Sequence, residues 1–458
     1  MKKWIYYIAL FFVCTGCDMT LLPETHITEE DLVENLVDIE KCFMSAYIMD
    51  DAITNKINCD WGLADDIMPM FENDWGGVFF YLQDAREMYK SQWVQYLYAG
   101  FYSSIAICNE TLYQLELCPA KDSAQWSQLK GEALALRAYD HFSLVNYFGR
   151  PYYDHPETNL GIVLKNEFSL KEASRSTVQV VYDSVLSDLN RAYPLLNSDA
   201  EAPARFSKDA VTALLCRVYL FMNKWDKVIA EANKLIGKYD LPSKPADQFT
   251  VINGEGEIFT LDFSYNKYGF FSYLEGYVAT WLVDAYQEGD PRTYNIIPGE
   301  DWVYIDGVLN FIPNGKNELY KLGKTYKALR IAEVYLNRAE AYCELGEDLL
   351  AREDLKAVVG NYGGDVSYID KLSGEALMNE ILMERAREFV CEGYRALDLL
   401  RKGLPVERYY TEEDPDTEEP QQIISIDDFT RILPIPHQEC YLNTLIEQNP
   451  GYPRDTKL

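Results

Sequence analysis

Residues 207–236 read SKDAVTALLCRVYLFMNKWDKVIAEANKLI, and this stretch decides the predicted fold class. Ser207 is a suitable N-cap, and Asp209 lies in the turn after it, where a negative charge stabilises a helix. Apolar residues recur at helical spacing up to Asn223-Lys224, and a second amphipathic run starts at once. The stretch therefore predicts two consecutive helices. Their apolar positions are Val211, Leu214, Leu215, Val218 and Met222, then Trp225, Val228, Ile229, Ala232, Leu235 and Ile236.

The same pattern returns at residues 331–359, where the first predicted helix ends at Gly346 and a second follows. When Tyr219 is aligned with Tyr342, the break at Asn223 falls on Gly346. Such units resemble tetratricopeptide repeats, in which paired helices stack to share a core. The separation of the two units is not a multiple of the roughly 34-residue repeat. They are therefore not parts of one uninterrupted array.

The rest of the chain is predicted to be mostly helical. Residues 132–148 are apolar around most of a helix and are followed by stop signals at Gly149 and Pro151, so this helix is predicted to be buried. Between about residues 239 and 327 the helical pattern weakens, and short alternating runs predict loops with a few small strands. The predicted fold class is mainly α, with helix pairs packed against a loop-rich lobe. Further helices are predicted at 92–117, 128–148 and 177–196, and a strand at 257–263.

The N-terminus is typical of a secretion signal. Two lysines precede an apolar run from Trp4 to Cys14, too short for a spanning helix, which needs about 20 residues. Cys17 directly follows Thr15-Gly16, as in bacterial lipoproteins, although Cys14 stands where those signals usually hold an aliphatic residue. A plain secretion signal or a short membrane anchor is the alternative. We expect a signal peptide at 1–16, a lipidated, palmitate-bearing Cys17 with a tether at 17–30, and a single domain at 31–458 whose variable lobe spans about 239–327.

Composition narrows the class of partner. The 458 residues carry a formal net charge of -31 at pH 7, which argues against nucleic acid and anionic lipid because both are polyanions. The aromatic content of 14%, with 35 tyrosines, suits sugar rings, but it equally suits cores and protein interfaces. The cysteines form no CxxC pair and the four histidines have no zinc-site spacing. Buried free thiols are therefore expected, with Cys108, Cys216, Cys343 and Cys391 inside helices.

Several sequence blocks, in order along the chain, resemble the SusD/RagB family of outer-membrane nutrient-binding lipoproteins. The resemblance extends over nearly the whole chain after Cys17, and it is weakest between residues 292 and 327, where this chain is short. The blocks are GEALALRAY at 131–139 with LVNYFG at 144–149, LVDAY at 282–286 with DPR at 290–292, EVYLNRAEA at 333–341, ERAREFVCEGYRALDLLRKG at 384–403, LPIP at 433–436 and QNPGY at 448–452.

This resemblance implies a helical protein with four tetratricopeptide-like units packed against a variable lobe. Family members are non-catalytic lids on a TonB-dependent (SusC-like) transporter barrel, and they capture oligosaccharides, or in some cases peptides, for import. By the same resemblance, we expect this chain to be lipid-anchored in the outer membrane and to face the cell exterior. No cofactor is expected.

Sugar capture needs flat aromatic faces for stacking and polar side chains for the hydroxyl groups. Two aromatic-rich, loop-like stretches, at residues 61–81 and 265–304, meet this requirement. The resemblance implies that the glycan site is built from the loop regions that correspond to them. For any one of these aromatic residues, a place in the core is the simpler interpretation. The predicted ligand-binding residues are Trp61, Asp66, Asn73, Trp75, Tyr81, Tyr265, Tyr268, Tyr273 and Trp302.

Other functions stay open at this point. A secreted helical glycoside hydrolase would need two carboxylates across a cleft, and a scaffold protein would use its helical face to bind partners. The series Glu384, Glu388 and Glu392 has helical i,i+4 spacing. Because Arg385, Arg387 and Arg395 are interleaved with it, it is better interpreted as an ion-pair lattice. The acidic run 412–420 could hold structural calcium, yet it lacks the spacing of an EF-hand loop.

Lipid anchoring can be tested by removing the thiol of Cys17. Cys17→Ala should release the protein from the membrane fraction and abolish palmitate labelling, because the thiol is the predicted attachment point. Fractionation and metabolic lipid labelling, with the wild type in parallel, measure both effects. A variant that still labels and sediments with the outer membrane would contradict the prediction.

Overall fold

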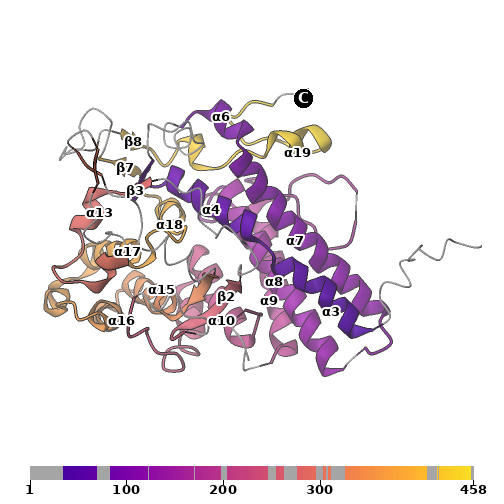
Figure 1. Cartoon of the computed structure of the whole chain (residues 1–458), viewed down its shortest axis with the longest axis horizontal. Coiled ribbons are helices and arrows are strands. Elements are labelled where there is room, and N and C mark those ends of the chain that lie inside the picture. Colours follow the sequence, from indigo (N-terminus) through magenta and orange to yellow (C-terminus); the bar gives the residue numbers. More distant parts are fainter. Residues whose placement is uncertain are drawn as a thin grey trace, which may run out of the picture.

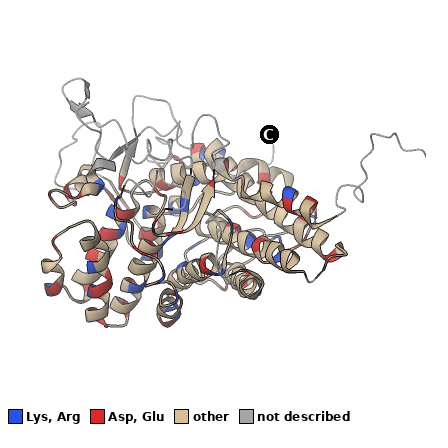
Figure 2. Ribbon diagram, turned by 60° about the horizontal axis from the view of Figure 1, so that its bottom comes forward, with Lys and Arg blue, Asp and Glu red and all other residues tan. Residues whose placement is uncertain are grey.

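Long helices form one side of the molecule and shorter helical pairs form the other, as the cartoon shows (Figure 1). Acidic and basic residues lie interspersed along the helices (Figure 2). The structure is a computed structural model that describes residues 35–69, 83–121, 123–169, 171–197, 204–245, 254–262, 276–295, 303–305, 308–310, 325–409, 420 and 422–454. Its α-helices are α3 (Leu36–Met44), α4 (Asp50–Leu63), α6 (Ala85–Lys90), α7 (Gln92–Leu117), α8 (Ala124–Phe148), α9 (Val178–Ala192), α10 (Lys208–Phe221), α11 (Trp225–Ala232), α13 (Thr280–Asp284), α15 (Ile331–Glu344), α16 (Asp348–Asn361), α17 (Gly374–Phe389), α18 (Arg395–Arg401) and α19 (His437–Leu442).

The strands are short and pair only two by two in the described part of the chain. Each pair is antiparallel: β1 with β3, β2 with β6, β4 with β5, and β7 with β8. This confirms the predicted fold class, a mainly helical protein with a few small strands. The strands are β1 (Ile67–Pro69), β2 (Glu257–Asp262), β3 (Gly276–Val278), β4 (Val303–Ile305), β5 (Val308–Asn310), β6 (Thr325–Arg330), β7 (Val406–Arg408) and β8 (Gln422–Ile424); single 3-10 turns are η1 (Ser45–Tyr47), η2 (Tyr193–Leu195), η3 (Pro291–Asn295), η4 (Ser367–Lys371) and η5 (Phe429–Arg431).

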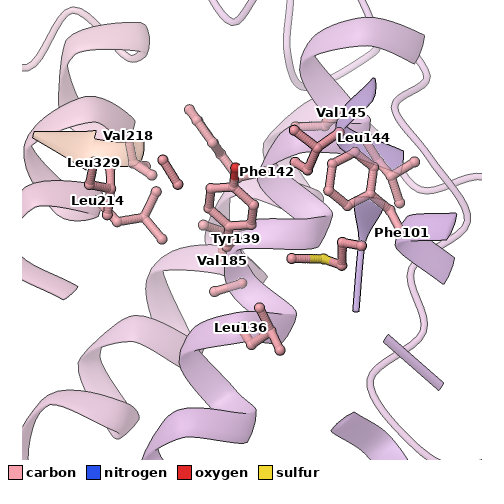
Figure 3. Close-up of a cluster of buried hydrophobic side chains, with 14 of the residues drawn as sticks. Phe101, Leu136, Tyr139, Phe142, Leu144, Val145, Val185, Leu214, Val218 and Leu329 are labelled. Atoms are coloured by element: carbon pink, nitrogen blue, oxygen red, sulfur yellow. The ribbon is translucent and has the colours of Figure 1, made fainter. Parts of the chain in front are cut away.

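Helix α8 is the centre of the core. Every residue from Gly131 to Phe148 is buried, including polar ones such as Arg137. Arg137 is neutralised by two hydrogen bonds of 2.8 Å to the Asp188 carboxylate on α9, which meets the requirement that a buried charge be paired. The helix ends before Gly149, as the sequence predicted, but it begins at Ala124. Figure 3 shows side chains of α8 in one apolar cluster with Phe101 of α7, Val185 of α9, Leu214 and Val218 of α10, and Leu329 of β6.

The two predicted helix–turn–helix units are α10–α11 and α15–α16. Ser207 caps α10 through the backbone N–H of Ala210, and Asn223 and Gly346 take positive φ angles of 56° and 77° at the two breaks. Helix α11 packs directly against α15, so units separated by about a hundred residues in sequence are neighbours in space. Helix α11 ends at Ala232, although Leu235 beyond it is fully buried, as its place in the apolar pattern indicated.

The predicted strand at 257–263 is β2, but its environment differs from the expectation. An alternating pattern predicts one buried face, whereas residues 257–261 are all buried. The reason is that β2 and its partner β6 lie against α10, and the ring of Phe259 packs among other aromatic rings. Its centroid lies 4.2 Å from that of Phe206 and 6.1 Å from that of Tyr139. The strand pair is therefore covered on both sides.

The carboxylates Glu384, Glu388 and Glu392 form a buried ion-pair lattice, as predicted, but the details of the prediction were wrong in two respects. Helix α17 ends at Phe389, so Glu392 lies beyond the helix and not on its face. The partners of Glu388 and Glu392 are not the interleaved arginines. They are Arg292, at 2.9 Å from Glu388, and Arg330, at 2.9 Å from Glu392.

Because the charges of this lattice are buried, their pairing affects the stability of the folded protein. Burial would lower the pKa of Arg292, but the carboxylates of Glu384, Asp290 and Glu388 raise it well above its ordinary value. Its terminal nitrogens lie 2.6 Å from Glu384 and 2.7 Å from Asp290. The lattice therefore joins α17 to the turn at residues 290–292 and to β6.

The expectation of thiols outside disulfides is confirmed for the described cysteines: none of them forms a disulfide, and all but Cys42 are buried. Cys108, Cys216 and Cys343 lie in helices α7, α10 and α15. Cys391 does not: it follows the end of α17 with a positive φ of 65°. Among the described residues, no helix combines the length and the apolar character needed to cross a membrane. Cys17 and the other residues of 1–34 lie outside the described part of the chain.

The lattice can be tested by removing its shared cation. Arg292→Met should lower the free energy of unfolding by about 3–5 kcal/mol, because three buried carboxylates, Asp290, Glu384 and Glu388, lose a counter-charge. Urea unfolding followed by circular dichroism measures the change. Lys356→Met is the matched control: its partner Asp370 is mostly exposed, and losing such a pair costs at most about 1 kcal/mol. Equal losses in the two variants would contradict a stabilising role for the lattice.

Candidate functional site

The described parts of the two aromatic-rich stretches meet at a pair of strands. Strand β1 ends the described part of the first stretch, and β3 begins the described part of the second. Their register places Ile67 opposite Val278 and Pro69 opposite Gly276. The chain therefore leaves β1 for residues 70–82 at the same point where residues 263–275 enter β3. We call β1, β3 and the side chains beneath them the strand root.

Most of the predicted ligand-binding residues lie outside the described part of the chain. Their roles stay predictions, and the structure adds only that the segments carrying most of them start from one place. This common origin is what the hypothesis of a joint site requires. The residues concerned are Asn73, Trp75, Tyr81, Tyr265, Tyr268, Tyr273 and Trp302.

Trp61 and Asp66 are described, and both point into the protein. Trp61, near the end of α4, is 7% exposed, and its indole N–H has no acceptor among the described residues. Asp66 is 2% exposed, and burial, together with the charges of Asp60 and Asp65, raises its pKa well above the ordinary value. Both residues are therefore buried side chains close to β1 in the sequence. Whether either contacts a ligand stays a prediction.

A bidentate ion pair fixes the strand root to α18. Arg395 donates to both carboxylate oxygens of Asp65, at 2.7 and 3.0 Å. The Trp281 ring lies 5.2 Å from the guanidinium, and its indole nitrogen donates to the backbone oxygen of Asp65 at 2.9 Å. A backbone hydrogen bond of 2.8 Å from Ala279 to Asp66 completes the join. Residues 65–66, which connect α4 to β1, are therefore bonded to both α13 and α18 through the Asp65 carboxylate and the backbone carbonyls of Asp65 and Asp66.

Sequence reasoning missed Arg395 and Trp281 in this role. The sequence predicts a place for Arg395 in the ion-pair lattice, because its position among acidic residues suggests a local partner. Its true partner, Asp65, lies 330 positions earlier in the chain. Trp281 stands directly before the LVDAY block, and that position was the only available signal.

Below the strand root, α4 carries two buried charges of opposite sign. Burial lowers the pKa of Lys56 to about 8 and raises that of Asp60 to about 7, while each group partly opposes the shift of the other. The Lys56 ammonium donates to the Gly393 carbonyl at 3.1 Å, and Asp60 accepts from the Ala396 backbone N–H at 3.2 Å. These contacts join α4 to the segment that leads into α18. The groups are enclosed, so they support the root and do not face a ligand.

The last turn of α4 is also tied to the C-terminal part of the chain. Arg408, in β7, donates to the Gly62 carbonyl at 2.7 Å and to the Ala64 carbonyl at 3.2 Å. These carbonyls lie at the helix end, where they have no partner within the helix. The described residues contain no group of three or more His, Cys, Asp or Glu side chains arranged to hold a metal ion. The strand root is thus a rigid base from which the two aromatic-rich stretches extend.

Two family models match the chain. Residues 47–220 match one described as starch-binding and associating with the outer membrane, and residues 300–452 match that of the SusD family. SusD-like protein P2 of Formosa agariphila is 23% identical over 530 residues, covering 99% of this chain and all of the relative. SusD-like protein P38 of the same organism is 25% identical over 377 residues, covering 67% of this chain and 72% of the relative.

Solved structures share the fold. A SusD superfamily protein from Bacteroides thetaiotaomicron has a TM-score of 0.78 at 23% identity, with 91% of this chain and all of that one covered. A laminarin-binding SusD-like protein has a TM-score of 0.68 at 22% identity, with 92% and 100% covered. The two family matches together span well over half of the chain, with most of the predicted family blocks inside them. The chain therefore belongs to the SusD/RagB family.

Proposed function

We propose that this protein is a lipid-anchored glycan-binding protein of the outer membrane. Residues 31–458 would form its binding domain, which captures an oligosaccharide outside the cell, performs no chemistry on it and needs no cofactor. The description of the matched family model as starch-binding supports this role, as does the structural neighbour that binds laminarin. The net charge of -31 favours a neutral ligand over a polyanion.

The observation that carries the proposal is the pairing of β1 with β3. It brings together the ends of two segments that are rich in tryptophan and tyrosine, and it does so on a base fixed by Asp65 and Arg395. Aromatic faces stack on sugar rings, whereas contacts with hydroxyl groups mostly replace contacts with water and contribute little net free energy. A site with several aromatic residues on a rigid base suits such a ligand.

The proposed role also requires a transporter. A protein tethered to the outer face of a membrane cannot move its ligand inward, so a second protein must do so. We propose a TonB-dependent, SusC-like barrel as this partner. Family membership supports the assignment, since one of the matched family models is described as associating with the outer membrane.

A glycan panel tests the proposal. We expect the purified full-length protein to bind at least one neutral oligosaccharide and to release no cleavage products on prolonged incubation. Calorimetry measures the binding, and chromatography of the incubated glycan detects products. Products would favour the glycoside hydrolase instead, binding of peptides alone would favour a peptide-binding family member, and binding of neither would favour a scaffold role.

The strand root gives a second test. Arg395→Met should weaken binding of the panel's best glycan by at least fivefold, because Asp65 loses its partner and the bases of both stretches lose their fixed geometry. Arg338→Met is the matched control: it removes a similar bidentate pair with Asp354, at 2.6 and 2.8 Å, between α15 and α16. Thermal melts follow the stability of both variants. Equal affinity in the two would show that the root does not support the site.

A further inference from the structure

A separate cavity lies on the described surface, and its lining includes none of the residues named at the strand root. It is bounded by the loop that follows α8, by η5 and by the C-terminal segment at residues 447–450. Its volume is about 490 Å³, within the range of roughly 300–1,000 Å³ that is usual for small-molecule pockets. No role in the fold accounts for so large a space, so its lining decides what it could bind.

The floor of the cavity is rigid because its polar groups are already bonded to the backbone. Arg175 donates to the carbonyls of Gly161, Phe148 and Leu160 at 2.7–3.0 Å, and Asn449 donates to those of Phe148 and Leu433 at 3.0 and 2.7 Å. Two of these bonds satisfy the last carbonyl of α8, which a helix end leaves without a partner. Side chains held in this way cannot turn to fill the space. The cavity is therefore preformed.

The wall made by residues 150–160 is also fixed. His155 has a positive φ of 45°, which is unusual for a residue with a side chain, and its carbonyl accepts from the backbone N–H groups of Thr158 and Asn159. Arg150 donates to Asp154 at 2.5 Å across the same loop. That bond uses only Nε of Arg150, which leaves its terminal amino groups as donors. Polar groups thus line the wall at fixed positions.

Phe429 supplies an aromatic face. The ring packs on Gly451, where a Cβ atom would lie 2.4 Å from a ring carbon, and the ring of Tyr452 meets it nearly edge-on at 5.1 Å. Two neighbours therefore hold the ring, yet Phe429 is 37% exposed and lines the cavity. A large aromatic side chain held rigidly and exposed in a pocket is a suitable platform for stacking.

The charges around the cavity balance. Arg150 is paired with Asp154. Arg175 lies in the cavity floor, and the exposed Glu447 lines the same cavity. No hydrogen bond joins the Glu447 carboxylate to another described residue, so it can accept from a ligand hydroxyl. An ionic ligand would find no excess of opposite charge. A ligand with an apolar face and several hydroxyl groups would meet Phe429, Glu447 and Arg150 together.

We infer that this cavity is a second ligand subsite, which takes one or two residues of a neutral sugar stacked on Phe429. The inference rests on the proposed glycan-binding function but concerns a place distinct from the strand root. Glu447 accepts a hydrogen bond from the sugar, and the free amino groups of Arg150 donate one. Two subsites on one surface would let the protein hold a long polysaccharide at separate points.

The test uses crystals of the full-length protein soaked with maltoheptaose, laminariheptaose, glucose, galactose, mannose or xylose, and with a peptide mixture. We expect sugar density over Phe429 in at least one soak. For the sugar found, Phe429→Ala should raise Kd for the cavity at least fivefold, and Glu447→Gln should raise it measurably. Glu447→Gln keeps the fold because the carboxylate makes no described contact. Phe168→Ala, at an exposed aromatic residue outside the cavity, is the control and should leave Kd unchanged.

The outcomes separate the two proposals. Density for peptide alone, no sugar density in any soak, or a Kd unchanged in both cavity variants would overturn the second subsite. If a panel glycan then still binds and Arg395→Met weakens it, the proposed function stands without this subsite. If the cavity variants weaken binding and Arg395→Met does not, the cavity is a sugar site and the strand root is not.

Discussion

Buried guanidinium groups paired with buried carboxylates determine how the C-terminal half of the molecule is arranged. Arg292 and Arg330 meet Glu384, Glu388 and Glu392 out of contact with water. A charge in such a place is tolerated only when its partner has the right distance and direction. Each pair joins elements far apart in sequence. Any other packing of these helices would therefore leave a buried charge without its partner. The lattice therefore specifies one arrangement, whatever its net contribution to stability.

The same rule extends to the candidate site. Three charged residues of one short segment serve different parts of the molecule: Glu392 pairs with Arg330 of β6, Arg395 with Asp65 at the strand root, and Asp398 with Arg385 of α17. Nearby, Arg401 binds Glu340 of α15 at 2.7 Å through its second amino group. The packing of the helices and the position of the strand root are thus both fixed by residues of one short segment, 392–398. A change in this segment would alter both.

The helices could be predicted from the sequence because each carries its own signal. Periodic apolar residues, a cap at Ser207 and breaks at Asn223 and Gly346 act within a few residues of one another. Pairing is different: nothing near Glu388 or Asp65 in the sequence identifies Arg330 or Arg395, because those contacts form only after distant segments pack. The three-residue strands β1 and β3 are too short to show a period. The sequence likewise groups Trp61 and Asp66 with the aromatic-rich stretch, although the structure buries both.

The join between β1 and β3 has a consequence for how such proteins diverge. Only three residue pairs hold the two strands together, and both residues of the ion pair that fixes them, Asp65 and Arg395, lie outside residues 70–275 in the sequence. Insertions, deletions and substitutions beyond Pro69 or before Gly276 therefore leave the ladder and its support unchanged. Either of the two segments beyond the strands can therefore change separately, while the helical body retains the sequence it needs to fold. Because the strands are so short, few residues of these segments are needed for the fold.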